Sequence, residues 1–268
     1  MRQRSRKPST LKLIQANAAI DAWYRKKLRA LIAEMHNSIS YHILAAYKSA
    51  ELSIGFAQDD TSSVVSLKRI MKRYGDRWRD KFNRMSRDIA KQFATKSARA
   101  TDRSVMASLR AAGFAIKFQP TQASIEAYRA VLSENVNLIK SIPEQYLKDV
   151  ETQVWNSVMI GGKTSTLTAK LQKSYGISYR RAAFIATDQN AKAKAIMENV
   201  RRQEIGITEA IWHHSHAGKT PRPTHVAMHG KRFELKKGMW DSAVQEWVWP
   251  GQLPRCRCSS RAILPGLA

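Results

Sequence analysis

A stripe of apolar residues between Leu67 and Phe93 constrains the fold more than any other feature of this sequence. Large apolar side chains recur there at alternating steps of three and four residues, which is the spacing of one face of an α-helix. The stripe consists of Leu67, Met71, Tyr74, Trp78, Phe82, Met85, Ile89 and Phe93. A long helix with one apolar face must bury that face against other elements. The sequence therefore predicts a core of packed long helices.

An earlier helix is expected before this stripe. Ser9 or Thr10 can cap it, because a hydroxyl there can accept a hydrogen bond from a free backbone N–H, and the helix should run toward Gly55. His36 and His42 lie within it and are expected to be ordinary surface or boundary residues.

Further helices should follow a break at residues 113–120. Ser141 and Pro143 favour a new helix start, since serine caps helices and proline is tolerated in the first turn. That helix should stop at Gly161. A shorter helix and then a long one should meet at residues 176–178 and continue to about residue 206.

From about residue 207 the pattern changes. ITEAIWHH, KRFEL and SSRAIL are typical of short strands, PTHVAMHG of one helical turn, and WVWPGQLPRCRC of a proline-bounded loop. The predicted fold class is mainly α, with long helices and a small C-terminal α+β domain. We expect three consecutive regions: a basic helical region at 1–120, a helical middle region at 121–206, and the α+β domain at 207–268.

The charge of the chain predicts an anionic partner. Lys and Arg number 46 against 21 Asp and Glu, which gives a net charge of +25, and residues 69–110 alone carry +9. Such a field attracts polyanions, although a charged helix face can also be simply solvated. The residues expected to contact nucleic acid are Arg2, Arg4, Arg6 and Lys7 in the N-terminal arm and Arg73, Arg77, Lys81 and Arg84 after it.

The sequence predicts neither secretion through a signal peptide nor insertion into a membrane. The N-terminus lacks the apolar length of a signal peptide, and no apolar run is long enough to cross a bilayer, so we expect no membrane partner. The two cysteines are separated by a single residue and suit a reducing compartment better than a disulfide framework.

Histidines and cysteines gather near the C-terminus and predict a structural zinc site. Imidazole and thiolate are the ligands that zinc favours, and the candidate ligands are His216, His225, His229, Cys256 and Cys258. A small domain with few core positions would gain stability from such a metal. The alternative is that these side chains only pack and form hydrogen bonds. A metal-dependent nuclease is a further alternative, but no Asp or Glu lies between Trp212 and Gly230 to bind a hard cation.

Several short motifs of the C-terminal half together resemble those of the phage head morphogenesis proteins, the Mu F-like minor head proteins of tailed phages. The resemblance covers about residues 135–260. The motif positions are Trp212, Arg222, Pro223, His225, Gly230, Lys231, Phe233, Pro250, Gly251, Cys256 and Cys258.

This resemblance implies a structural protein and not an enzyme. It implies a location in the virion, in the head interior at the portal vertex, after assembly in the host cytoplasm. The implied partners are the portal protein or the major capsid protein, and double-stranded DNA bound without sequence specificity. The function expected is head morphogenesis and DNA packaging or delivery. A metal-dependent nuclease and a non-specific DNA-binding protein with no capsid role are the alternatives.

Overall fold

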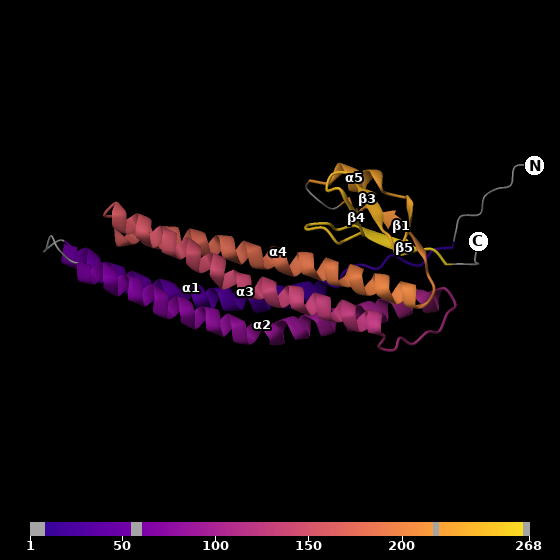
Figure 1. Cartoon of the computed structure of the whole chain (residues 1–268), viewed down its shortest axis with the longest axis horizontal. Helices are drawn as coiled ribbons and strands as arrows, with labels where there is room; N and C mark the ends of the chain where they lie inside the picture. Colours follow the sequence, from indigo (N-terminus) through magenta and orange to yellow (C-terminus); the bar gives the residue numbers. More distant parts are fainter. Residues whose placement is uncertain (1–8, 55–60, 217–219, 265–268) are drawn as a thin grey trace, which may run out of the picture. The chain divides into compact units, whose positions relative to one another are not determined.

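Long helices form most of the chain, and short strands follow them. The computed structural model describes residues 9–54, 61–216 and 220–264, and Figure 1 shows the order of the elements. The helices are α1 (Ala18–Ile54), α2 (Thr61–Ala111), α3 (Gln122–Met159), α4 (Thr164–Glu204) and the short α5 (Pro223–Ala227). The strands are β1 (Glu209–His213), β2 (Arg232–Glu234), β3 (Met239–Asp241), β4 (Glu246–Val248) and β5 (Ser259–Ala262). The predicted fold class is therefore confirmed.

The start of α1 differs from the prediction. Neither Ser9 nor Thr10 caps it: Thr10 forms an isolated antiparallel bridge with Ile263. Asn17 is the cap instead, because its side-chain oxygen accepts the backbone N–H of Ala19 at 2.9 Å. The preceding segment stays extended, and its Leu11 side chain is buried in the core beside the strands. Tertiary burial thus outweighs a local capping signal.

Two predicted helix boundaries are absent, since α3 and α4 each run without interruption. Pro143 lies inside α3, where the side chains on both sides of it, Ile142 and Tyr146, are buried in one core. Gly176 lies inside α4, between the buried Ser174 and Ser178. An interior glycine costs only about 1 kcal/mol, so a continuous buried face can keep the helix intact. The predicted break at residues 113–120 is confirmed, because it separates α2 from α3.

The chain forms two compact units that join distant parts of the sequence. Ala22–Lys91 and Ser133–Ala186 form the first, called here the helical unit. Met1–Asp21, Gln92–Leu132 and Thr187–Ala268 form the second, called here the mixed unit because it holds the strands. The sequence predicts three consecutive regions, whereas these two units each combine separate parts of the chain. The two divisions are not equivalent, so the three regions stay a prediction.

Four of the eight residues of the predicted stripe are buried in the helical unit, and Phe93 is buried in the mixed unit. Leu67, Trp78 and Phe82 are buried, whereas Met85 is 37% exposed and lies outside the core. His36 corrects another expectation: it is 3% exposed, and its Nδ1 lies 2.8 Å from the hydroxyl of Tyr146. Burial lowers the pKa of His36, because the charged imidazolium loses hydration there.

The mixed unit contains a three-stranded antiparallel sheet with the order β2-β1-β5, of which Figure 1 labels the neighbours β1 and β5. Ala210 in the central strand pairs with Phe233 on one side and Ala262 on the other. A separate hairpin, β3-β4, pairs Trp240 with Trp247. The predicted strands at ITEAIWHH, KRFEL and SSRAIL are confirmed, but β4 includes Glu246–Val248, part of which was expected to be loop. None of the helices in the described ranges combines the length and apolar character needed to cross a membrane.

Candidate metal centre

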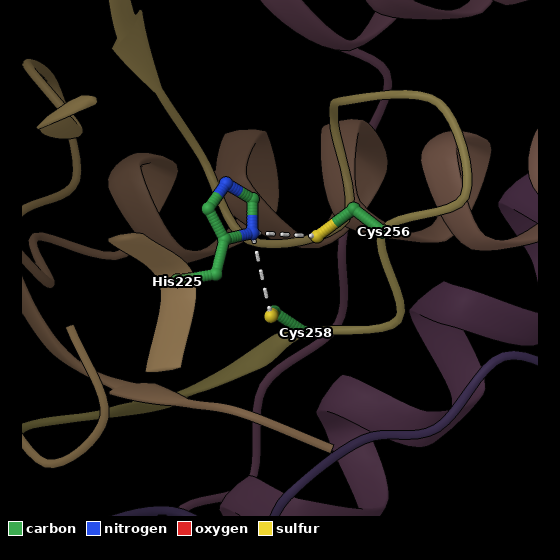
Figure 2. Close-up of side chains that lie close together, drawn as sticks. All are labelled: His225, Cys256 and Cys258. Atoms are coloured by element: carbon green, nitrogen blue, oxygen red, sulfur yellow. Dashed lines mark hydrogen bonds between the residues drawn. The ribbon is translucent and has the colours of Figure 1, made fainter. Parts of the chain in front are cut away.

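His225, Cys256 and Cys258 come together in the mixed unit. Their ligand atoms all lie within 4.8 Å of one another, and all three residues are buried. Figure 2 shows both sulfurs approaching the same ring nitrogen of His225. His225 Nδ1 lies 3.3 Å from Cys256 Sγ and 3.7 Å from Cys258 Sγ. One imidazole nitrogen and two thiol sulfurs at these distances could supply three ligands of one metal ion, and the three residues are called here the metal-binding group.

Local structure explains how His225 reaches the sulfurs. Pro223 begins α5 with the fixed φ that suits a first helical position, so His225 falls in the only turn of this helix. The ring of Trp212 from β1 packs edge-on against the His225 ring, with centroids 5.1 Å apart. Because Trp212 is fully buried, it limits the positions that the imidazole can take.

The loop that carries Cys256 and Cys258 packs against α4 and forms a hydrogen bond with it. Gly251 has φ +88, and a Cβ there would lie 3.2 Å from Cβ of Ala195 on α4. Arg255 N–H donates a hydrogen bond to Asp188 of α4 at 2.6 Å, and Arg222 donates to the carbonyl of Pro254 at 3.0 Å. The C-R-C segment is therefore held by backbone contacts and close packing.

A hydrogen bond links the two thiols, and its proton shifts their pKa values in opposite directions. A hydrogen bond from the Cys258 thiol, helped by contacts with His225 and with backbone N–H groups, lowers the pKa of Cys256 to about 4, although burial opposes this. The hydrogen bond to Cys256, burial and the charge of Cys256 raise the pKa of Cys258, while contacts with Trp212 and the Ser215 backbone lower it. A divalent cation between the sulfurs would replace this proton, since metals bind thiolates.

N–H groups surround both sulfurs. Gly251 N–H donates to Cys256 Sγ at 3.4 Å. The Trp212 indole N–H, which has no hydrogen-bond partner within the described residues, and the backbone N–H of Ser215 lie near Cys258 and oppose the rise of its pKa. Buried negative charge is costly unless hydrogen bonds or cations compensate it. The surroundings of the two sulfurs therefore fit two thiolates that bind a metal.

Asp241 completes the arrangement on the far side of the imidazole. Its Oδ2 lies 3.1 Å from His225 Nε2, and its Oδ1 accepts the backbone N–H of Ala243 at 3.0 Å. Burial raises the pKa of Asp241, but the hydrogen bond from the Ala243 backbone and the nearby Thr224 and His225 side chains lower it by more than burial raises it. No sequence pattern pointed to this residue, which lies 16 positions from His225 in a hairpin that was not expected.

Burial weighs against nucleophilic or hydrolytic chemistry at this group. Cys256 is 5% exposed, His225 2% and Asp241 0%, so a substrate has no approach to the sulfur. Asp241 could supply the acidic residue that the nuclease alternative lacks, yet both of its oxygens are already engaged. Three protein ligands leave one position of a tetrahedral metal open, so it is the burial of the group, and not the number of its ligands, that favours a structural centre over a catalytic one.

The other predicted ligands lie outside this group. His216 is exposed and has a positive φ of 51. His229 is also exposed, and its Nδ1 accepts the backbone N–H of His214 at 3.0 Å. Their rings, with centroids 5.3 Å apart, form a separate histidine cluster with His213 and His214.

The predicted nucleic-acid contacts fall into three groups. Arg2, Arg4, Arg6 and Lys7 lie outside the described residues. Arg73, Arg77 and Arg84 are exposed on α2. Lys81 is half-buried and already engaged: its Nζ lies 2.5 Å from Glu34 and 4.6 Å from the centre of the Trp78 ring.

Comparison with known proteins places the metal-binding group in a recognised segment. A family model described as Phage Mu protein F like protein matches residues 148–261. The expected resemblance is confirmed over this range, which starts somewhat later than the predicted residue 135.

One curated relative comes from Haemophilus influenzae and is described only as an uncharacterized protein. It is 25% identical over 263 residues, which cover 94% of this chain and 55% of the relative. The chain thus spans about half the length of this relative. No solved structure matches the chain.

The motif positions of the Mu F-like segment surround the metal-binding group. Gly230, with φ +78, donates its N–H to the carbonyl of Trp212 at 2.9 Å. Lys231 accepts the Trp212 N–H through its carbonyl at 2.9 Å, and Phe233 packs on the Trp212 ring with centroids 5.9 Å apart. Pro250 is buried beside Gly251. These positions therefore contribute mainly through backbone geometry and packing around His225, Cys256 and Cys258.

Proposed function

We propose that this protein is a minor head protein of a tailed phage that associates with the portal or the inner capsid surface and with packaged double-stranded DNA. The observation that carries this proposal is the match of residues 148–261 to the Phage Mu protein F like family. The net charge of +25 supports the DNA contact, because cations that neutralise phosphates release counterions without reading sequence. Location in the virion head follows from the same proposal.

A strip of exposed cations on α2 supports contact with DNA. It consists of Arg69, Arg73, Arg77, Arg84, Arg87 and Lys91, all in the helical unit. At 3.6 residues per turn these positions fall within an arc of about 80°, and at 1.5 Å per residue they extend over about 33 Å. Within the described ranges none of them forms an ion pair, unlike Lys72, Arg79 and Lys81 on the same helix. We propose that this strip binds phosphates of the duplex.

The salt dependence of duplex binding tests the strip. A variant with Arg73, Arg77 and Arg84 changed to Gln should lower the slope of log K against log salt by up to about 2.7, since each phosphate contact contributes about 0.9. A control variant with Lys72, Arg79 and Lys81 changed to Gln removes the same charge from ion-paired positions. Fluorescence anisotropy with a labelled duplex at several salt concentrations measures both slopes. Equal slopes in the two variants would show that only total charge matters.

We also propose that His225, Cys256 and Cys258 bind one structural zinc ion. Two sulfurs and an imidazole nitrogen are ligands of the type zinc prefers, and magnesium and calcium prefer oxygen. The N–H of Gly251, which donates to Cys256 Sγ, fits a thiolate that carries negative charge. The ion would hold the cysteine loop to α5 and so stabilise the mixed unit.

Elemental analysis of the purified protein tests this site. We expect about one zinc per chain, lost when Cys256 and Cys258 are both changed to Ser, together with a lower thermal midpoint. An exposed pair, Ser242→Ala and Gln245→Ala, serves as the matched control and should keep the metal. Protein with no bound metal that shows the same stability as the Cys→Ser variant would refute the zinc assignment.

A further inference from the structure

We propose that Asp241 is a positioning residue of the metal centre, which holds the His225 ring so that Nδ1 faces Cys256 and Cys258. This inference rests on the proposed zinc site and adds a residue outside the expected ligands. In this role the Asp241 carboxylate determines which nitrogen of the His225 ring binds the metal.

Contacts at both ring nitrogens of His225 define the orientation of its imidazole. Nε2 lies 3.1 Å from Asp241 Oδ2, while Nδ1 lies 3.3 Å from Cys256 Sγ and 3.7 Å from Cys258 Sγ. A carboxylate can only accept at this point, so Nε2 must carry the hydrogen. Neutral imidazole then has its lone pair on Nδ1, which is the atom that a metal between the sulfurs requires.

Asp241 is itself held rigidly enough to orient another side chain. It is the last residue of β3 and pairs with Glu246 across the hairpin. Its second oxygen accepts the N–H of Ala243 at 3.0 Å, and its side chain is fully buried. Because both oxygens are engaged, the carboxylate cannot turn away from His225 without losing a buried hydrogen bond.

Packing alone does not explain why the carboxylate of Asp241 is buried. Burying an ionised carboxylate is costly unless hydrogen bonds and a nearby cation compensate it. A metal-bound imidazole polarises its Nε2–H and makes it a stronger donor to the carboxylate, and the carboxylate in turn makes Nδ1 a better ligand. The Asp241–His225 pair therefore has its strongest role when a metal is bound.

The test compares Asp241→Asn with Glu246→Gln, an exposed acidic neighbour across the same hairpin. Zinc affinity is measured by competition with a chromogenic chelator, and the Co2+-loaded proteins are compared by their visible absorption. We expect Asp241→Asn to bind zinc about 10- to 100-fold more weakly and to shift the Co2+ bands. Glu246→Gln should match the unmodified protein in both measurements.

A second measurement needs no variant and stays informative if Asp241→Asn does not fold. Long-range 1H–15N NMR of the zinc-loaded protein reports the tautomer of each histidine. We expect His225 to carry its hydrogen on Nε2 and to bind metal through Nδ1.

The outcomes separate this inference from the proposed zinc site. If the unmodified protein binds no zinc, the zinc site itself is refuted. If it binds zinc and folded Asp241→Asn binds it equally well, the positioning role is refuted and the zinc site stands. Binding through Nε2 of His225 would also overturn the positioning role.

Discussion

Gly238 lies at a turn where the structure leaves no room for a side chain. Its φ is +82, and a Cβ there would lie 2.6 Å from the carbonyl oxygen of Val248 and 3.2 Å from the Trp249 ring. Alanine at this φ costs about 1–2 kcal/mol. Relieving a clash with a backbone atom requires a shift of the β3-β4 hairpin, which costs about 1–3 kcal/mol more. Gly238→Ala should therefore lower the free energy of unfolding by about 2–5 kcal/mol.

Gly206→Ala provides the matched control in the same unit. Gly206 also has a positive φ, +79, but a Cβ there would meet no atom within 4 Å. It should lose only the conformational cost of about 1–2 kcal/mol. Urea unfolding followed by tryptophan fluorescence, at one fixed zinc concentration, measures both variants. Equal losses for the two alanines would refute the clash and with it the described packing of β3 on Val248.

Two further predictions concern buried polar groups. Because burial lowers the pKa of His36 in the folded protein, the unfolded chain binds more protons below about pH 6.5, and stability should fall as pH drops from there through the folded pKa. His36→Gln should reduce the loss of thermal stability between about pH 7 and pH 5, and an unchanged pH profile would contradict this. Arg202 is 1% exposed and pairs with Glu198 and Ser260. Arg202→Met should therefore cost about 3 kcal/mol in urea unfolding, whereas the exposed Arg232→Met should cost under about 0.5 kcal/mol, and similar losses would contradict the buried pair.

Local sequence signals predicted elements but not every boundary between them. The apolar stripe from Leu67 predicted a long helix correctly, because a period of 3.6 residues is set by the helix itself. The starts predicted at Ser141 and Ser178 were wrong, since capping residues describe what a helix end can do and not whether the helix ends. Buried side chains on both sides of Pro143 and of Gly176 keep α3 and α4 continuous instead.

Local sequence signals likewise identified candidate ligands of the site but not their arrangement in space. Ligand chemistry and the family motifs selected His225, Cys256 and Cys258 together with His216 and His229, because residue type alone shows which side chains can bind a metal. Spacing could not show which of the histidines would lie beside the sulfurs. That depended on α5, whose single turn brings His225 inward, while His229 remains exposed.

The sequence by itself determined the long helices, three of the five short strands, the positive charge and the resemblance of residues 148–261 to the Phage Mu protein F like family. Each of these depends on composition, on short-range periodicity or on motif order, which exist before the chain folds. The tertiary structure alone decided the bridge of Thr10 to Ile263, the ion pair of Lys81 with Glu34, and the contact of Asp241 with His225. These contacts join residues far apart in the chain, and only the packing of the folded elements brings such residues together.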